Sequence, residues 1–355
     1  MTMTPIKTAI IGYGFSAKTF HIPFIASMPE FELSAISTSQ TDSVNKDWPD
    51  VAHYQNADEL LTQSDAELVI ITAPNDVHFD LAKKALENGK HVILEKPFVT
   101  QVSDGEALIE LAVKQQRVLS VYHNRRWDGD FLTVKKLIEE QRLGDVKYIE
   151  SHFDRFRPEV RQRWREQTTN GGGILFDLGS HLIDQALVLF GLPDAVTAQC
   201  LMLREGSSNV DYFNVVLHYP NHITSLHGDL FSAGPNPRFS VKGTQGSYEK
   251  TGLDPQEARL IAGVSPLNEN WTEEDPEHYG HLYRDDSVEV ITTEPGHYQG
   301  YFAEIANAIR NGSCPPVSAK DALWNIKLIE LAMESSRLGQ TLPLDKTSLL
   351  DVLDK

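Results

Sequence analysis

Residues 8–17 read Thr8-Ala9-Ile10-Ile11-Gly12-Tyr13-Gly14-Phe15-Ser16-Ala17, and this stretch decides the fold. An apolar run is followed directly by the pattern Gly-x-Gly-x-x-Ala, formed by Gly12, Gly14 and Ala17. Gly12 permits a tight turn, Gly14 lets the backbone approach a pyrophosphate, and Ala17 allows close packing of the next helix. The stretch therefore predicts a strand, a phosphate-binding turn that includes Phe15 and Ser16, and a helix N-terminus that holds the anion. An ordinary strand-to-helix turn is the alternative, because glycines punctuate many turns.

This stretch opens a repeating pattern that continues to about residue 123. Short apolar runs rich in β-branched residues alternate with longer segments whose apolar residues recur every three or four positions. The alternation predicts β-α-β units and hence a doubly wound parallel sheet, the Rossmann arrangement, over residues 1–123. The expected strands are 8–11, 33–36, 68–71, 91–94 and 118–122, and the expected helices are 17–28, 76–88 and 103–116.

A different pattern begins at Asn124 and continues to the last residue. Consecutive strands joined by short turns predict a mainly antiparallel sheet, so residues 124–355 are expected to form a second, α/β domain. A Gly171-Gly172-Gly173 loop opens a helix within it, and the polar segment 255–295 is interpreted as long surface loops with at most short strands. The expected strands are 146–156, 196–203, 212–219, 223–230, 239–241 and 247–249, and the expected helices are 131–141, 174–190, 298–310 and 319–338.

Composition limits the possible classes of function. A chain of 355 residues usually forms two domains. Its formal net charge of -18 would repel nucleic acid and anionic lipid, so an anionic ligand must be held by a local device. The two cysteines, Cys200 and Cys314, lie far apart, which favours neither disulfides nor a zinc cluster and fits a reducing cytoplasm. No apolar run approaches the roughly 18–20 residues of a membrane span, and the first residues do not resemble a secretion signal.

The end of the second apolar run bears on which dinucleotide binds. Sites for NAD usually have Asp or Glu there, whose carboxylate accepts hydrogen bonds from the ribose hydroxyls. This chain has Ser37-Thr38-Ser39 instead. Hydroxyls can donate to a 2′-phosphate, a repelling carboxylate is absent, and Lys46 would add positive charge if its loop folds inward. We therefore expect NADP, with NAD possible; alternatively, the three residues only cap a turn and either cofactor binds.

Two segments carry side chains suited to acid-base chemistry. Glu95-Lys96-Pro97 follows the fourth expected strand, so Lys96 lies at the carboxyl edge of the parallel sheet, where such sheets bind ligands. A lysine there can hydrogen-bond a substrate hydroxyl and share in proton transfer, although taken alone it is more simply a surface lysine.

The second segment is the helix after the glycine loop. Asp177, His181 and Asp184 share one face of it, and they are costly to bury without partners, so a polar cleft is expected. His181 can exchange a proton near neutral pH, while Asp177 would orient it or hold a substrate hydroxyl. A satisfied core histidine is the alternative. No metal is expected here, because no Cys or second His stands at ligand spacing.

Taken in order, these motifs resemble the Gfo/Idh/MocA family, which includes glucose-fructose oxidoreductase and inositol 2-dehydrogenase. The resemblance covers nearly the whole chain. It implies a Rossmann domain followed by an α/β domain with an open, mainly antiparallel sheet, whose exposed face often serves oligomer assembly, so a homodimer or homotetramer is expected. The motifs are Gly12 to Ala17, Thr72-Ala73-Pro74-Asn75 with His78, Glu95-Lys96-Pro97, Asn124-Arg125-Arg126-Trp127, and the block from Gly171 to Asp184.

The resemblance also implies roles for individual residues. Lys96, Asp177 and His181 would form a catalytic triad, in which the acid-base role falls to the lysine or the histidine in different relatives. Trp164 and Arg165 resemble a pair found in a subgroup of NADP-linked reductases and would approach the nicotinamide, or else serve as a packed anchor and a solvated charge. The other residues expected around the cofactor are Thr72, Pro74, Asn75, His78, Glu95, Lys96 and Asn124.

The expected function is hydride transfer between nicotinamide C4 and a secondary alcohol or ketone of a sugar, cyclitol or related polyol. Two alternatives stay open. One is a cofactor-sensing regulator without turnover, which the set of Lys96, Asp177 and His181 disfavours. The other is an NAD-dependent glycosidase-type enzyme of the same superfamily, which would retain its cofactor without net oxidation. The substrate itself is not identified by the sequence, because sugar hydroxyls are recognised by side chains from several loops.

Overall fold

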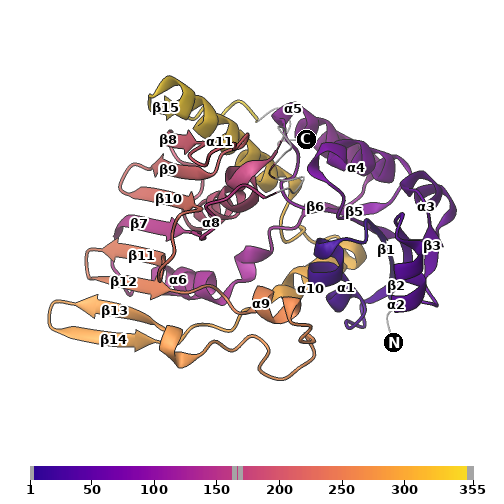
Figure 1. Ribbon diagram of the computed structural model, residues 1–355, viewed down its shortest axis with the longest axis horizontal. Coiled ribbons are helices and arrows are strands. Elements are labelled where there is room, and N and C mark those ends of the chain that lie inside the picture. The colour runs from indigo at the N-terminus through magenta and orange to yellow at the C-terminus, as the bar shows by residue number, and fades with distance from the viewer. Residues whose placement is uncertain (1–3, 162–165, 167–170, 350–355) are drawn as a thin grey trace.

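The computed structural model describes residues 4–161, 166 and 171–349. Figure 1 shows two sheets side by side, with helices between them and on the outer side of the first sheet. Within the described residues the first sheet has six strands and the second has nine. None of the helices in these ranges is both long and apolar enough to cross a membrane.

The first sheet is a doubly wound parallel sheet, as the sequence predicts, with strand order β3-β2-β1-β4-β5-β6. Its central strands are apolar on both faces because helices cover both, and all four residues of β4 are buried. The strands are β1 (Ile6–Ile11), β2 (Phe31–Ser37), β3 (Ala52–Tyr54), β4 (Leu68–Ile71), β5 (His91–Leu94) and β6 (Leu119–Val121). The helices are α1 (Ile22–Ile25), α2 (Thr41–Asp47), α3 (Ala57–Gln63), α4 (His78–Glu87) and α5 (Val102–Gln115).

The edge strand β3 and the helices α2 and α3 are not among the elements expected from the sequence. β3 has three residues, too few to show a period, and α2 and α3 have seven residues each. The strand expected as the fourth is therefore β5, the fifth along the chain. The position of Glu95 and Lys96 at its carboxyl end is unaffected.

The second sheet is mixed and mostly antiparallel, as expected. Its order is β14-β13-β12-β11-β7-β10-β9-β8-β15, and only β7 and β10 pair in parallel among its described strands. The strands are β7 (Val146–His152), β8 (Ala195–Leu201), β9 (Tyr212–His218), β10 (Ile223–Asp229), β11 (Pro237–Gly243), β12 (Gly246–Thr251), β13 (Gly280–Arg284), β14 (Ser287–Ile291) and β15 (Leu342–Pro343).

Residues 255–295 are more structured than the sequence suggests. They include a short helix, α9 (Gln256–Ile261), and the hairpin β13–β14, which extends the second sheet. The expectation of little besides loops is wrong for α9, because six residues are too few to show a helical period. This helix matters for function because it contributes to the pocket described below.

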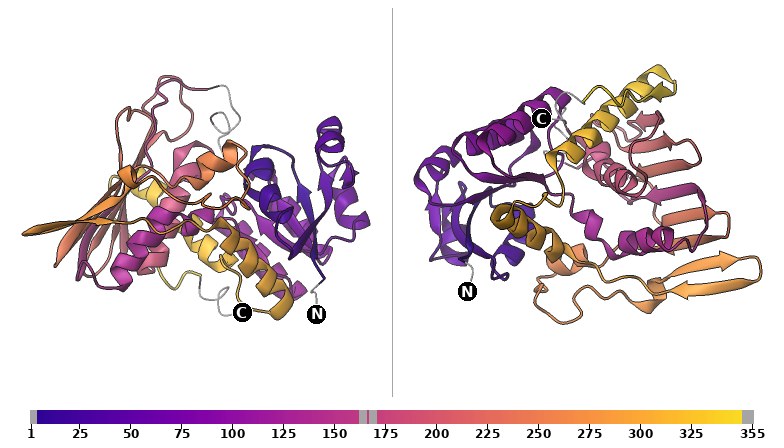
Figure 2. Two further views of the ribbon diagram at one scale, coloured as in Figure 1. Left: turned by 90° about the horizontal axis from the view of Figure 1, so that it is seen from below. Right: turned by 180° about the vertical axis from the view of Figure 1, so that it is seen from behind.

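Helices cover one face of the second sheet. Figure 2 shows α6 (Gly129–Glu139), α8 (Ser180–Phe190) and α11 (Ala319–Leu338) between the two sheets, whereas no helix of the described residues covers the opposite face of the second sheet. We call this the helix-free face. α10 (Tyr298–Asn311) returns to the first sheet, where Phe302 stacks on Phe24 with 5.0 Å between ring centroids. The C-terminal helices therefore join the two halves, and a division at residues 123 and 124 stays a prediction.

Candidate active site

The glycine turn after β1 has the geometry of an anion cradle. Gly12 has φ +98°, and a Cβ added there would lie 2.8 Å from Thr72 Oγ1, so the turn requires glycine. Thr72 braces the turn by donating to the carbonyls of Ile11 and Gly12 at 3.1 and 3.2 Å. At Gly14 a Cβ would meet nothing within 4 Å, so this glycine leaves open space in front of the turn. Ala17 is buried, as close packing of the next helix requires.

The end of β2 lies beside this turn, since the Gly12 N–H donates to the Ser37 carbonyl at 2.9 Å. Ser37 itself is buried, Thr38 is half-buried, and Ser39 is exposed. Thr38 Oγ1 accepts from the Gln40 N–H at 3.2 Å, as in the turn-capping alternative. Ser39 and Thr38 are therefore the residues of this trio that a ligand at the turn can reach, and none of the three brings a carboxylate.

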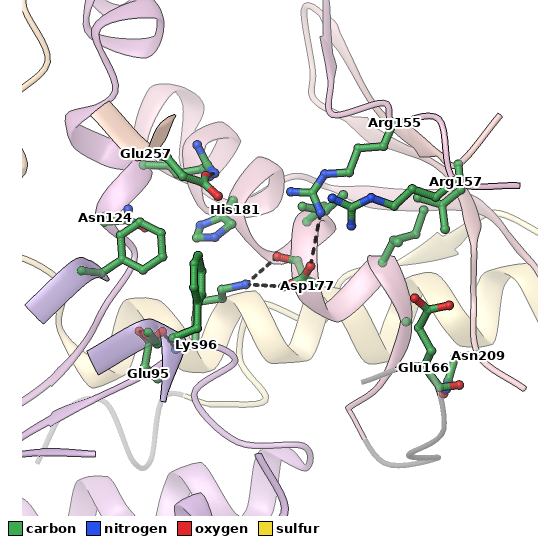
Figure 3. A pocket seen from close by; sticks show the side chains of 18 of the residues that line it. Glu95, Lys96, Asn124, Arg155, Arg157, Glu166, Asp177, His181, Asn209 and Glu257 are labelled. Atoms are coloured by element: carbon green, nitrogen blue, oxygen red, sulfur yellow. Dashed lines mark hydrogen bonds and ion pairs between the residues drawn. The ribbon is translucent and has the colours of Figure 1, made fainter. Parts of the chain in front are cut away.

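Lys96 and Asp177 converge from the two halves of the chain (Figure 3). Lys96 Nζ donates to the backbone carbonyl of Asp177 at 2.7 Å and to its Oδ1 at 2.8 Å. The lysine follows β5, and Asp177 lies in the helical turn Leu175–Gly179 that precedes α8. Both side chains are partly accessible, with 13% and 25% of their surface exposed, so a ligand can reach this pair.

Glu95 links the lysine to the glycine turn. Its carboxylate accepts hydrogen bonds from Ser16 Oγ and from the Lys96 N–H, and His21 Nε2 lies 2.9 Å from it. Burial opposes ionisation, but the contacts with His21 and Ser16 and the Lys96 charge outweigh it and lower the pKa of Glu95 to about 2. Glu95 is therefore a carboxylate anion that connects the phosphate-binding turn to Lys96 through hydrogen bonds. The contact with His21 was not predicted from the sequence.

His181 lies in the same pocket, with its ring between Glu257 and Lys96 in Figure 3. Burial, together with the positive charges of Lys96 and Arg125, holds its pKa well below the ordinary value, so the imidazole is neutral at physiological pH. Among the described residues, Nδ1 of His181 has no hydrogen-bond partner. The expectation that Asp177 orients His181 is wrong, because within the described residues the carboxylate of Asp177 contacts Lys96 and Arg155.

The pocket around these residues has a volume of about 460 Å³, which is within the range of small-molecule sites. Its basic residues include several that the sequence analysis did not single out as site residues. Arg155 Nη1 lies 3.9 Å from Asp177 Oδ2, and Arg125 forms an ion pair with Glu257 of α9. Further pocket residues are Phe15, Ser16, Glu95, Asn124, Arg157, Glu166, Arg204 and Asn209. Residues so distant in sequence carry no shared spacing by which they could have been grouped.

Other residues expected at the site do not line this pocket, although Asn75 lines a smaller hollow beside it with Lys96 and Asp177. The amide of Asn75, just after Pro74, donates to the Gly171 carbonyl at 2.9 Å and so fixes the glycine loop. His78 is buried, and its ring nitrogens each lie 3.0 Å from a carbonyl, those of Pro97 and Ala73. The side chain therefore positions the two loops that carry Ala73 and Pro97, and its contact with the cofactor stays a prediction.

Asp184 and the pair Trp164 and Arg165 were also expected near the site. Asp184 does not line the cleft, because its carboxylate is buried and accepts two hydrogen bonds from Arg126 at 2.7 and 2.8 Å. That ion pair removes the cost of burial on which its placement in a polar cleft rested. Trp164 and Arg165 lie outside the described residues.

Comparison with known sequences and structures identifies the family. Residues 6–123 match the model for the oxidoreductase family, NAD-binding Rossmann fold, and residues 135–344 match the one for the oxidoreductase family, C-terminal alpha/beta domain. The chain is 46% identical over 347 residues to YdgJ of Escherichia coli strain K12, an uncharacterized oxidoreductase, covering 95% of this chain and 98% of that protein. It is 41% identical over 344 residues to IolW of Bacillus subtilis strain 168, a scyllo-inositol 2-dehydrogenase (NADP(+)), covering 96% of each.

Solved structures agree with this assignment. The structure of yvaA from Bacillus subtilis, which is named as an oxidoreductase, has a TM-score of 0.93 and 40% identity, covering 96% of this chain and 99% of that one. An oxidoreductase from Bacillus cereus has a TM-score of 0.87 and 33% identity, covering 96% and 99%. With both family models matched along the chain and relatives of this similarity over nearly their whole lengths, the protein belongs to the Gfo/Idh/MocA family of oxidoreductases and carries its NAD-binding Rossmann domain.

Proposed function

We propose that the protein is an NADP-preferring dehydrogenase or reductase that acts on a secondary alcohol or the corresponding ketone of a sugar, cyclitol or related polyol. The observation that carries the proposal is the convergence of Lys96, Asp177 and His181 in one pocket beside the glycine turn. A proton donor or acceptor and a dinucleotide cradle in the same cavity are what oxidation of an alcohol by a nicotinamide requires.

The residues at the turn fit a dinucleotide. Gly12 and Gly14 combine a positive-φ turn with open space in front of it, and the following helical segment presents its N-terminus. When bound, the cofactor supplies the hydride acceptor or donor at its C4 carbon. Gly12, Gly14, Ser16 and Thr72 would hold it at the phosphates or brace the turn that does so.

The protein side chains then manage the substrate oxygen. The Lys96 ammonium, held by Asp177, donates a hydrogen bond to that oxygen and stabilises negative charge that develops on it. His181, neutral because of burial and its cationic neighbours, accepts the hydroxyl proton during oxidation and returns it during reduction. Asp177 therefore acts by positioning Lys96 rather than His181.

The cavity favours a polyhydroxylated substrate. Basic, acidic and amide side chains line it alongside a few apolar ones, so several hydroxyl groups can be recognised by direct hydrogen bonds. IolW, a relative at 41% identity, is named for oxidising an inositol with NADP(+). That relative also supports NADP as the cofactor here, together with the hydroxyl residues Thr38 and Ser39 where a carboxylate would repel a 2′-phosphate.

A substrate panel tests the proposal. Sugars, inositols and keto-sugars are each assayed with NADP and with NAD by the nicotinamide absorbance near about 340 nm. We expect cofactor reduction or oxidation with at least one polyol, and a larger kcat/KM with NADP. Substrate conversion with no net absorbance change would instead favour the glycosidase-type alternative, and cofactor binding without turnover on any substrate would favour a regulator.

We also propose that the protein assembles as a homodimer or homotetramer through the helix-free face of its second sheet. In Figure 2 none of the helices in the described part of the chain packs on this face. Its edge hairpin exposes Val288 and Val290, with 59% and 58% of their surface accessible. Light scattering after gel filtration gives the mass directly, and a monomer at micromolar concentration would contradict the proposal.

A further inference from the structure

A second cluster of side chains that can act as ligands lies on the helix-free face of the second sheet, and none of its three members lines the catalytic pocket. β7 and β10 pair in parallel with His152 directly opposite His227. Side chains opposite each other on neighbouring strands share one face, and here the two ring centroids are 5.0 Å apart. Asp154 follows His152 by two residues and reaches both rings.

The three side chains present converging donor atoms. His152 Nδ1 lies 3.1 Å from Asp154 Oδ2, and His227 Nδ1 lies 2.8 Å from Asp154 Oδ1. One ligand atom from each residue lies within 4.8 Å of the other two. The Asp154 side chain is 5% exposed and the two imidazoles 17% and 18%, so the cluster is largely buried but open to solvent on one side.

The surroundings favour a cation. Glu150 and Asp229 each place a carboxylate oxygen 4.0 Å from the Nε2 atom of His152 and His227, respectively. Three carboxylates thus lie around two imidazoles, and this concentration of negative charge favours the binding of a divalent cation.

We propose that this cluster is a binding site for a divalent transition-metal ion, zinc in the first place. Two imidazole nitrogens and one carboxylate oxygen are a donor set that zinc takes, with water in the fourth position, whereas magnesium and calcium prefer oxygen ligands alone. Donor atoms around a tetrahedral zinc are about 3.4 Å apart at metal–ligand distances of about 2.0–2.1 Å. One donor atom from each of the three side chains lies within 4.8 Å of the other two, so small side-chain rotations bring the three to this spacing. The sequence analysis predicted no metal, because His152 and His227 become neighbours only through strand pairing.

The metal would join β7 to β10 at the parallel pair of the sheet, with its open coordination position on the same face that we propose for assembly. The site is independent of the proposed oxidoreductase function, since none of its three ligands lines the catalytic pocket. Because zinc would take the place of the Nδ1 protons that donate hydrogen bonds to Asp154, zinc binding should weaken as the pH falls.

The test is calorimetric titration of the untagged, full-length protein, freed of metal with EDTA, with ZnCl2. We expect one zinc per chain, and we expect His227→Gln to weaken binding by about 100-fold or more, as loss of a direct ligand should exceed the effect of losing a supporting one. His281→Gln, on β13 of the same sheet but outside the cluster, is the matched control and should bind zinc as the wild type does.

A second measurement does not depend on how well a variant folds. Adding CoCl2 to the metal-free wild-type protein should give the visible absorption bands of cobalt in a nitrogen- and oxygen-ligated site, and ZnCl2 should remove them. Failure of the wild type to bind either metal would overturn the proposal and leave a hydrogen-bonded His-Asp-His cluster. Equal zinc affinity for His227→Gln and His281→Gln would overturn it as well.

Discussion

Replacing Lys96 with methionine removes the ammonium group while keeping a side chain of similar length. In the structure this group donates two hydrogen bonds to Asp177, at 2.7 and 2.8 Å, and it stands in the pocket where the substrate oxygen would be held. The variant leaves the glycine turn unchanged. Its effect should therefore appear in turnover and not in cofactor affinity.

The size of the effect follows from the role of the group. Stabilisation of a developing negative charge by one positioned donor is worth about 10²–10³-fold in rate, or about 3–4 kcal/mol, so kcat should fall by that factor. The folded state should also lose about 1–3 kcal/mol, because the ion pair is largely buried and its removal leaves the Asp177 carboxylate with Arg155 at 3.9 Å. Such a loss lowers Tm by a few degrees at most.

The assay compares Lys96→Met with a control at the other end of the same strand. Lys90 precedes β5 and donates to the carbonyls of Ser64 and Ala66, away from the pocket, so Lys90→Met should reduce Tm but keep kcat within about twofold. NADP affinity is measured for both variants by fluorescence titration. The reasoning is refuted if Lys96→Met retains turnover within about tenfold of wild type, or if it loses cofactor affinity by the same factor as turnover.

Three further predictions test the cofactor site and His181. Gly14→Ala should leave Tm nearly unchanged, because nothing lies within 4 Å of the new Cβ, yet weaken NADP binding about tenfold or more; equal affinity in fluorescence titration would show that the phosphates lie elsewhere. Ser39→Asp places a carboxylate at an exposed position after β2 and should raise the Kd of NADP about tenfold while changing that of NAD much less; parallel changes for both cofactors would argue against a 2′-phosphate at this spot. Burial and the Lys96 charge depress the pKa of His181 below its unfolded value of about 6.5, so its contribution to stability is present above about pH 6.5 and is lost as the pH falls below it. His181→Gln should therefore show a smaller fall in Tm between about pH 7.5 and pH 5.5 than wild type does, and an identical fall would contradict a neutral buried imidazole.

Elements with a strong local signal could be predicted from the sequence. The run that ends at Gly12 and Gly14 specifies the strand, the turn and the helix. At Gly12 the structure shows why glycine is required, because φ is +98° and an added Cβ would lie too close to Thr72. The helix expected at residues 319–338 coincides with α11, since 20 residues give enough turns for a period to be seen. By contrast, β3 and α9 are too short for any period.

The composition of the site was partly predictable for the same reason. Lys96 is placed by the carboxyl edge of the parallel sheet, and Asp177 and His181 by one helix face, so local rules bring each near the pocket. Which of these side chains contact each other depends on the tertiary structure. Asp177 contacts Lys96 instead of His181, and Asp184 forms an ion pair with Arg126. In both cases the partner comes from a chain segment that is distant in sequence.

The arginines and Glu257 of the pocket are the residues that could least be predicted from the sequence. Arg155 follows β7 and Glu257 lies on α9, and neither segment carries a motif that marks it as part of a site. The same holds for His152 and His227, whose proximity depends on the register of two strands. Strand pairing and packing create these groupings, so they could be found only in three dimensions.

A crystal structure of the protein with bound NADP tests the central claim most directly. We expect the pyrophosphate over residues 12–17 and the nicotinamide ring in the cavity beside Lys96 and His181, with its C4 carbon facing the space where a substrate hydroxyl would meet both side chains. A dinucleotide bound away from the glycine turn, or a nicotinamide ring outside that cavity, would contradict the assignment of these residues to hydride-transfer chemistry.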